Sequence, residues 1–240
     1  MLHDNAFDGA RSAAVEQELQ VFSYIVSHDL AASMRHVAEF SRLLLDELGD
    51  DITSRQRAHA DQIRAASNKS HLMMEQLLAF SRVQQKVLLP IRQDAMIVMR
   101  SVLLRLGVSQ AAGARVSVEP LGEVFADADL FADALFALMD NALKFTRPGV
   151  GASVEVRSDH DQAFWRIQVH DNGIGVAPAL REKAFQMFQR LNGETAYPGV
   201  GAGLAICRRI ARRHGGEVRF IDSDIGAMVE LSLPRTPALQ

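Results

Sequence analysis

The chain has 240 residues, enough for one large domain or two modest ones, and its 48% hydrophobic and 23% charged residues are ordinary for a globular protein. Its formal net charge of -3 gives no electrostatic reason to expect nucleic-acid binding. No apolar run approaches the ~20 residues that cross a bilayer, and the N-terminus lacks the layout of a signal peptide. The single cysteine, Cys207, excludes an intramolecular disulfide, fits a reducing compartment, and lies in an apolar helical stretch where a small core residue is expected. We therefore expect a cytoplasmic protein with no membrane segment in this chain and no nucleic-acid partner.

The N-terminal third predicts a helical hairpin. Residues 11–83 contain no proline and one glycine, Gly49, which is the stop signal between two long helices, with Thr53 or Ser54 as the next N-cap. Both helices carry an apolar stripe at helical spacing, formed by Leu19, Phe22, Val26, Leu30, Val37, Leu44 and Leu48 in the first and by Ile63, Ala66, Ser70, Met73, Leu77 and Phe80 in the second. One hairpin leaves these stripes exposed, whereas two hairpins bury them. The pattern therefore predicts a homodimer whose hairpins form a four-helix bundle.

The same stripe locates His28. With Leu30 as the origin and about 100° per residue, Val26, Val37, Leu44 and Leu48 fall within about 40°, whereas His28 falls near about 160°. A histidine on a helix is most often a core residue. Here the geometry favours the solvent face.

From about Lys86 the pattern changes, because glycine and proline become frequent and short β-type runs alternate with helical stretches. The strands are expected at 115–119, 153–157, 164–169, 217–221 and 228–233, and the helices at about 94–106, 129–144 and 203–214. This order predicts an α+β sandwich, in which helices cover one face of a sheet. The chain is thus expected to be multi-domain, with a helical hairpin at 11–84, a linker at 85–92 that contains Pro90, and the sandwich at 93–236.

Two glycine-containing turns indicate a nucleotide site. Asp171 follows an apolar strand and precedes Asn172-Gly173-Ile174-Gly175, where a carboxylate can accept a hydrogen bond from an exocyclic amine such as that of adenine, and the glycines permit close backbone approach. Gly199, Gly201 and Gly203 precede a helix that starts near Leu204, so their amides and the helix N-terminus form an anion site. Each turn alone also fits a purely structural role.

A third feature lies on the helix expected at 129–144. Asn141 and Lys144 are three residues apart and share one face, where an amide oxygen can ligate Mg²⁺ and an ammonium can contact phosphate. An ordinary surface pair is the alternative.

Taken in order, these segments resemble the transmitter core of bacterial two-component sensor histidine kinases, from about Val15 to Leu233. Five boxes carry the resemblance: 22–30 (FSYIVSHDL) is similar to the histidine box, 140–146 (DNALKFT) to the asparagine box, 170–175 (HDNGIG) to the first glycine box, 184–191 (AFQMFQRL) to the phenylalanine box, and 199–204 (GVGAGL) to the second glycine box. The order and spacing of five motifs are far more specific than any one of them.

The resemblance implies a role for each matched position. His28 is the implied phosphoacceptor with Asp29 as its general base, and Asn141 is the implied Mg²⁺ ligand. Lys144 and Arg190 are implied phosphate contacts, Phe145 flanks the nucleotide, and Asp171 binds the adenine amine. The remaining implied ATP-binding positions are Gly173, Gly175, Gly199, Gly201, Gly203 and Leu204. Residues 176–198 form the implied lid over ATP, packed by Phe185 and Phe188, whose alternative role is core packing.

Three positions depart from the family pattern. Ser33 stands where a proline usually follows the histidine box, so the first helix is expected to run straighter. Ala32 stands where threonine or asparagine often positions water, which predicts weak or absent phosphatase activity toward a phosphorylated partner. Ala137 stands where the first asparagine of the asparagine box is usual, which places more of the metal coordination on Asn141.

The resemblance implies a histidine kinase that autophosphorylates His28 and passes the phosphoryl group to an aspartate on a response regulator receiver domain. One alternative is a histidine phosphotransferase with a degenerate ATP site, which Ala137 keeps open. Another is a member of the wider ATPase superfamily shared with gyrase and mismatch-repair proteins, against which the exposed His28 and the hairpin argue. The chain is too short to include a sensor, so we expect either a piece of a larger sensor or a kinase controlled by partner proteins.

Overall fold

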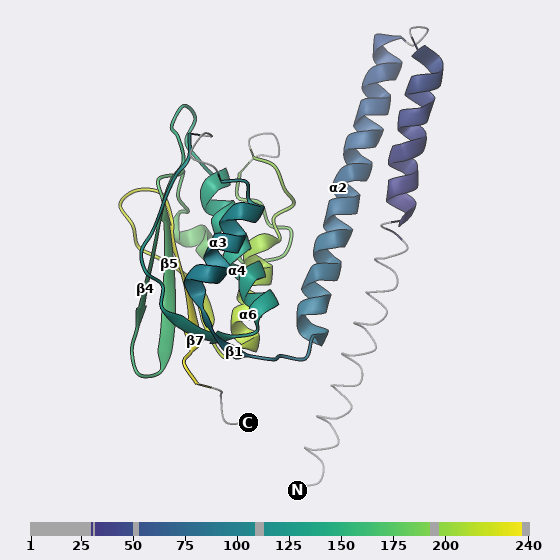
Figure 1. Cartoon of the computed structure of the whole chain (residues 1–240). Helices are drawn as coiled ribbons and strands as arrows, with labels where there is room; N and C mark the ends of the chain where they lie inside the picture. The colour runs from purple at the N-terminus through teal and green to yellow at the C-terminus, as the bar shows by residue number, and fades with distance from the viewer. Residues whose placement is uncertain (1–29, 31, 50–52, 109–112, 193–196, 237–240) are drawn as a thin grey trace, which may run out of the picture. The chain divides into compact units, whose positions relative to one another are not determined.

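The computed structural model describes residues 30, 32–49, 53–108, 113–192 and 197–236 (Figure 1). The chain divides into two units, Met1–Arg82 and Val83–Gln240. None of the helices in the described part of the chain has the length and apolar character that a bilayer crossing would need.

The described part of the first unit confirms the helical hairpin. Residues 32–48 are helical, Gly49 has a left-handed φ of 52°, and helix α2 spans Ser54–Gln85. Thr53 starts α2 through a reciprocal cap: its Oγ1 accepts from the Gln56 N–H at 3.3 Å, and Gln56 Oε1 accepts from the Thr53 N–H at 2.9 Å. His28 and Asp29 lie outside the described residues.

The apolar stripe of the first helix is exposed in the single chain. The exposed fractions of Leu30, Val37, Leu44 and Leu48 are 42%, 41%, 54% and 40%. A chain on its own contributes two helices, so the predicted four-helix bundle stays a prediction about the assembly.

The second unit is built on a five-stranded sheet in the order β2-β4-β5-β7-β6, with a separate antiparallel pair, β1-β3. Only the β2-β4 pair of the five-stranded sheet is parallel. The strands are β1 (Ile91–Asp94), β2 (Arg115–Val118), β3 (Glu123–Ala126), β4 (Ser153–His160), β5 (Phe164–Asp171), β6 (Glu217–Ile221) and β7 (Met228–Pro234). All five strands of this sheet were expected from the sequence, whereas the short β1 and β3 were not.

Alternation of side chains decides which face of the sheet is buried. In β5, Trp165, Ile167 and Val169 point into the core, and the intervening residues point away. Trp165 packs edge-on against Phe131, with ring centroids 5.7 Å apart, and its Nε1–H donates to the Leu121 carbonyl at 2.8 Å. These contacts fix the central strand of the sheet, β5, against the helical layer.

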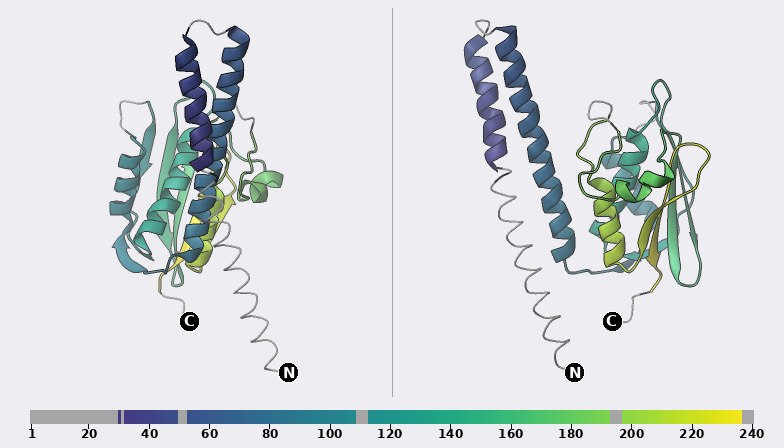
Figure 2. Two further views of the ribbon diagram at one scale, coloured as in Figure 1. Left: turned by 90° about the vertical axis from the view of Figure 1, so that its right-hand side faces the viewer. Right: turned by 180° about the vertical axis from the view of Figure 1, so that it is seen from behind.

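The helices lie on one face of the sheet, as both Figure 1 and Figure 2 show. They are α3 (Ala95–Arg105), α4 (Ala128–Lys144) and α6 (Gly203–Arg213), and a short 3₁₀ turn, η3 (Pro178–Leu180), leads into α5 (Arg181–Ala184). The N-cap of α4 is Asp127. Apolar side chains spaced three and four residues apart are buried along the length of this helix. This architecture confirms the predicted α+β sandwich.

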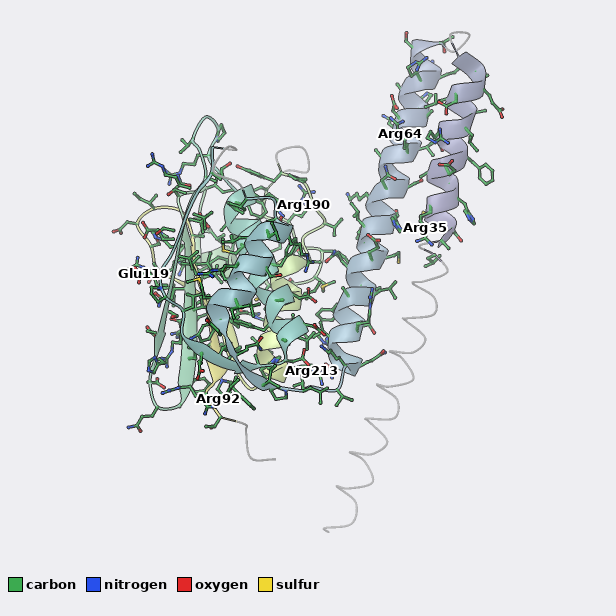
Figure 3. All side chains as sticks on the ribbon, viewed as in Figure 1. Arg35, Arg64, Arg92, Glu119, Arg190 and Arg213 are labelled. Atoms are coloured by element: carbon green, nitrogen blue, oxygen red, sulfur yellow. The ribbon has the colours of Figure 1, made fainter. Side chains whose placement is uncertain are left out.

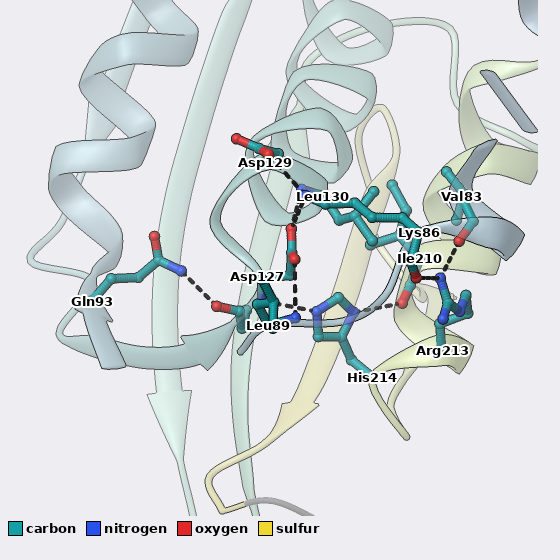
Figure 4. A network of polar contacts seen from close by, with 11 residues as sticks. Val83, Lys86, Leu89, Gln93, Asp127, Asp129, Leu130, Ile210, Arg213 and His214 are labelled. Carbon is teal, nitrogen blue, oxygen red and sulfur yellow. Dashed lines mark hydrogen bonds and ion pairs between the residues drawn. The ribbon is translucent and has the colours of Figure 1, made fainter. Parts of the chain in front are cut away.

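A polar network anchors the first residues of the second unit at one end of the helical layer (Figure 4). Asp127 Oδ1 accepts from Lys86 Nζ at 2.5 Å, and Asp127 Oδ2 accepts from the Leu89 N–H at 3.2 Å. Burial acts to raise the pKa of Asp127, but the bonds from Lys86 and from the Leu130 and Leu89 amides outweigh it, and the pKa lies below its usual value.

His214, the C-cap of α6, belongs to the same network. Its Nε2 accepts from the Asp127 N–H at 3.0 Å, so its Nδ1 carries the proton and donates to the Ile210 carbonyl at 2.9 Å. The neighbouring Arg213 guanidinium donates to the Val83 and Lys86 carbonyls. The N-terminal end of α4 and the C-terminal end of α6 are thus held together by polar groups that are buried or half-buried.

Candidate functional site

The last turn of α4 forms the centre of the candidate site. Lys144 Nζ lies 3.4 Å from Asp140 Oδ2 and 4.7 Å from the centroid of the Phe145 ring. Phe145 ends the helix, and its N–H donates to the Asn141 carbonyl at 3.1 Å. The predicted residues of the asparagine box are therefore clustered at one helix end.

The first glycine turn packs directly on the residue that ends α4. The Ile174 N–H donates to the Phe145 carbonyl at 3.0 Å. A Cβ added at Gly173 would lie 2.1 Å from that same carbonyl oxygen, so no other residue fits there without displacing the backbone. The predicted glycine at this position is required by close approach between the two segments.

Asp171 is held through one carboxylate oxygen. Its Oδ1 accepts from the Gly173 N–H at 2.8 Å and from the Ala227 N–H at 3.0 Å. Both of its hydrogen bonds from described residues reach Oδ1, which leaves Oδ2 for another donor. Burial raises the pKa of Asp171, while the two amides, His170 and Arg147 act to lower it. The arrangement gives a fixed, partly buried acceptor suited to an amine.

The loop between β6 and β7 completes the surroundings of Asp171, and the sequence analysis did not include it. The Asp171 N–H donates to the Ala227 carbonyl at 2.9 Å. Gly226 has a φ of 67°, and a Cβ added to it would lie 1.8 Å from the Asp171 carbonyl oxygen. A glycine two residues before an expected strand was the one signal in the sequence that pointed to this contact.

The second glycine loop lies on the other side of the α4 terminus. A Cβ added at Gly199 would be 3.4 Å from Lys144 Nζ, and one added at Gly203 would be 3.9 Å from Asn141 Nδ2 and 3.7 Å from the Ala137 Cβ. Gly199 and Gly201 have φ values of 110° and 77°, which L side chains rarely adopt. Gly203 then starts α6, and Leu204 is the next residue of that helix. The loop therefore presents backbone and a helix N-terminus to Asn141 and Lys144.

Arg190 binds the second loop. Its guanidinium donates to the Gly199 carbonyl at 2.8 Å and to the Tyr197 carbonyl at 2.7 Å. Figure 3 shows Arg190 and Arg213 at opposite ends of the helical layer, so Arg190 is at the same end as the site. In this structure Arg190, which was predicted to contact phosphate, therefore holds the second glycine loop through two backbone carbonyl groups.

Tyr197 was also missed by the sequence analysis. Its hydroxyl donates to the Thr146 carbonyl at 2.7 Å, and its ring lies 5.0 Å from the Phe145 ring. A single tyrosine beside a glycine loop gives no motif, so this contact could not be read from the sequence.

The two phenylalanines of the phenylalanine box differ. Phe185 is buried, lies 5.2 Å from the Phe220 ring, and is covered by the Arg208 guanidinium at 4.0 Å. Phe188 is half-buried and has a φ of 61°, a conformation that costs free energy for a bulky residue. Core packing therefore accounts for Phe185, while Phe188 is a strained point in the segment predicted to form the lid.

The described site thus brings together Asn141, Lys144, Phe145 and the two glycine loops, with Asp171 at the far side. Gly175 lies in the first turn, where a Cβ would be 2.7 Å from the Gly226 carbonyl oxygen. A fixed carboxylate, a cation and backbone amides at a helix N-terminus, all on an α+β sandwich, suit the class of nucleotide-binding ATPase domains.

Comparison with known proteins agrees with this class. Residues 126–237 match the family described as histidine kinase-, DNA gyrase B-, and HSP90-like ATPase. The chain is 29% identical over 238 residues to the sensor protein KdpD of Escherichia coli, covering 95% of this chain and 26% of KdpD. The chain spans about a quarter of the length of the curated relatives it matches.

Solved structures give the same result. The mycobacterial sensor histidine kinase MprB is 28% identical with a TM-score of 0.53, and the match covers 62% of this chain and 100% of that chain. The histidine kinase ThkA in complex with the response regulator protein TrrA has a TM-score of 0.64 at 18% identity, covering 94% of this chain and 65% of that chain, which shows a shared fold.

Residues 126–237 are therefore similar to the histidine kinase-type ATPase family. The resemblance of the chain to sensor histidine kinases, predicted from its five motifs, is confirmed.

Proposed function

We propose that the chain is an ATP-dependent protein-histidine kinase that autophosphorylates His28 and transfers the phosphoryl group to an aspartate of a response regulator. The observation that carries the proposal is the position of the α4 terminus between two glycine loops, with Lys144 near Gly199 on one side and Phe145 against Gly173 on the other. This is a site for a molecule with an amine-bearing base at one end and phosphates at the other.

The described residues fit ATP. Asp171 offers Oδ2 to the adenine amine, and Lys144 with the amides of Gly199, Gly201 and Gly203 offers positive charge and donors to the phosphates. Asn141 would hold Mg²⁺ through its amide oxygen, and the ion would neutralise charge on the phosphates. Phe145, paired with Tyr197, would flank the nucleotide.

The proposed chemistry at His28 is a phosphoryl transfer. An imidazole nitrogen forms a bond to the γ-phosphorus, the bond from that phosphorus to the bridging oxygen of ADP breaks, and the imidazole proton passes to Asp29. The exposed helix face predicted for His28 makes such an approach sterically open. In the second transfer, the phosphoryl group moves from His28 to the carboxylate of a receiver domain.

We also propose a homodimer, because the apolar stripe of the first helix is exposed in the single chain. A response regulator is the expected partner, as in the ThkA–TrrA complex, which has the same fold. The cytoplasm is the expected compartment, since phosphoryl transfer from ATP takes place where ATP is abundant.

One alternative function has a specific observation in its favour. Ala137 faces Gly203 with a methyl group where a second amide would strengthen metal coordination. A phosphotransferase that receives its phosphoryl group from another protein would tolerate this loss.

The experiment that decides is labelling with γ-labelled ATP and Mg²⁺. We expect acid-labile, alkali-stable label on the full chain and none on His28→Ala. The matched control is His36→Ala on the same helix, which should keep the label. A chain that stays unlabelled under varied conditions, yet accepts a phosphoryl group at His28 from a phosphorylated receiver, would contradict the kinase and establish the phosphotransferase.

A further inference from the structure

Arg147 is three residues beyond the end of α4 and lies outside every motif that the function uses. The residue is largely exposed, but its Nε–H donates to the Gly173 carbonyl at 2.9 Å. Gly173 is buried and also gives its own N–H to Asp171 Oδ1 at 2.8 Å. Arg147 therefore fixes Gly173, and Gly173 in turn fixes the carboxylate of Asp171.

The rest of the segment 145–147 is fixed on both sides. The Phe145 carbonyl accepts from Ile174 N–H at 3.0 Å, and the Thr146 carbonyl accepts from the Tyr197 hydroxyl at 2.7 Å. Arg147 can therefore transmit its position to the turn, because its own backbone is anchored between the first glycine turn and the second loop. A long side chain on a mobile segment could not do this.

Arg147 also brings charge close to Asp171. The charged or titratable groups that act on this carboxylate are Arg147, from the segment after α4, and His170, its neighbour on β5. The His170 ring is directed toward the β6–β7 loop, where its Nε2 contacts the Ile225 carbonyl at 2.9 Å and Ser223 Oγ at 2.8 Å. Of these two side chains, Arg147 is the one that carries a permanent positive charge.

We propose that Arg147 is a positioning residue that sets base selectivity, by fixing the 171–174 turn so that the Asp171 carboxylate is held to accept from an amine. The proposal rests on the proposed nucleotide site and deepens it. An ionised Asp171 can only accept, so it binds a base that carries an exocyclic amine and repels one that carries a carbonyl oxygen at the same place.

The test compares ADP with IDP, the nucleotide in which a carbonyl replaces the amine, by titration calorimetry on the full chain. For Arg147→Met, which removes charge and donor at similar length, we expect ADP affinity to fall about tenfold, as for loss of a hydrogen bond to a charged group. IDP affinity should change much less. The ratio of the two affinities therefore falls, whereas damage to the fold alone would weaken both nucleotides together.

The pH profile separates charge from hydrogen bonding. Burial already raises the pKa of Asp171, and loss of Arg147 raises it further, so ADP binding should be lost at a higher pH on the acid side for Arg147→Met. Arg147→Lys keeps the charge and loses the Nε–H, so it should retain the acid limb of the unsubstituted chain while binding ADP more weakly. Arg92→Met, a change of an exposed arginine on β1, is the control and should alter neither quantity.

The outcomes distinguish this inference from the proposed function. If the unsubstituted chain binds no adenine nucleotide at any pH, the nucleotide site itself is contradicted. If it binds ADP and Arg147→Met keeps the same ADP-to-IDP ratio and the same acid limb, only the role of Arg147 is overturned. A lower melting temperature with an unchanged ratio also overturns it, because that result assigns Arg147 to the fold alone.

Discussion

At the scale of single residues, the site depends on how one carboxylate oxygen is used. Asp171 Oδ1 receives two backbone amides, one from its own turn and one from the loop before β7, and this leaves the direction of Oδ2 fixed. The second amide can reach Oδ1 only because Gly226 has no side chain and takes a left-handed φ of 67°. A loop remote in sequence therefore orients the residue proposed to recognise the base.

Gly226→Ala tests this dependence. The added Cβ would lie 1.8 Å from the Asp171 carbonyl oxygen, so the loop must move and Ala227 N–H must leave Oδ1. We expect ADP affinity to fall at least about tenfold, given the cost of one broken hydrogen bond to a charged group.

The matched control is Gly122→Ala, where φ is 70° and nothing lies within 4 Å of the added Cβ. It should lower the free energy of unfolding by roughly 1–2 kcal/mol, the cost of the left-handed backbone, and leave ADP binding intact. Equal ADP affinity in both variants would show that the loop does not orient Asp171.

At the scale of elements, α4 joins the two ends of the second unit. Its last turn carries Asn141 and Lys144, and its N-cap, Asp127, accepts from Lys86, Leu89 and Leu130. At that N-cap the half-buried His214 accepts the Asp127 N–H through Nε2, which requires a neutral imidazole. Protonation would turn this acceptor into a donor that faces another donor.

The stability of the protein should therefore depend on pH through His214. Burial lowers the pKa of His214 below 6.5, so in mildly acidic solution the unfolded chain binds a proton that the folded chain does not. The free energy of unfolding should fall as the pH drops through about 6.5, with a slope below about 1.4 kcal/mol per pH unit, the limit for one proton.

Denaturant unfolding between about pH 7.5 and about pH 5.5 measures the slope. His214→Gln, whose amide oxygen can still accept from Asp127, should flatten it, while His160→Gln, at the exposed end of β4, should not. A slope that persists unchanged in His214→Gln would assign the pH dependence to other groups.

The sequence predicted the elements that have a clear period. Alternation in β5 and the three-and-four spacing in α4 each follow from one buried face, so these elements could be located within a few residues. The strands β1 and β3 were not located, although β2, with the same four residues, was expected; β1 shows no alternation of buried and exposed residues. At the site, Asp171 and the glycines could be found because they are close in sequence, whereas Ala227, Tyr197 and Arg147 reach the site through backbone contacts that leave no pattern.

At the scale of the whole molecule, the first helix presents an apolar face that its own chain does not cover. Phe40 is 68% exposed and Leu44 is 54% exposed, one turn apart on one side of the helix. Apolar surface of this kind is stabilised by association, and a second copy of the same hairpin offers a matching face.

Substitution of this face should weaken the proposed homodimer. We expect Phe40→Gln with Leu44→Gln to shift the chain toward monomers in sedimentation velocity at micromolar concentration, and to lower labelling of His28 if each chain phosphorylates its neighbour. Arg42→Gln with Asp46→Gln introduces two glutamines, also four apart, on the opposite side of the helix. It removes two exposed ion pairs of little energetic weight, Arg42–Asp46 and Arg42–Glu39. That control should stay dimeric, and identical sedimentation of both variants would contradict the proposed interface.

The buried thiol of Cys207 has a practical consequence for such experiments. The side chain is fully enclosed by α6 and its surroundings, and burial raises its pKa to about 12, so it remains a protonated thiol at neutral pH. Since no other cysteine occurs in the chain, a fluorophore or spin label attached to one introduced surface cysteine would report from that position alone. The native molecule is thus a ready background for distance measurements between its two units.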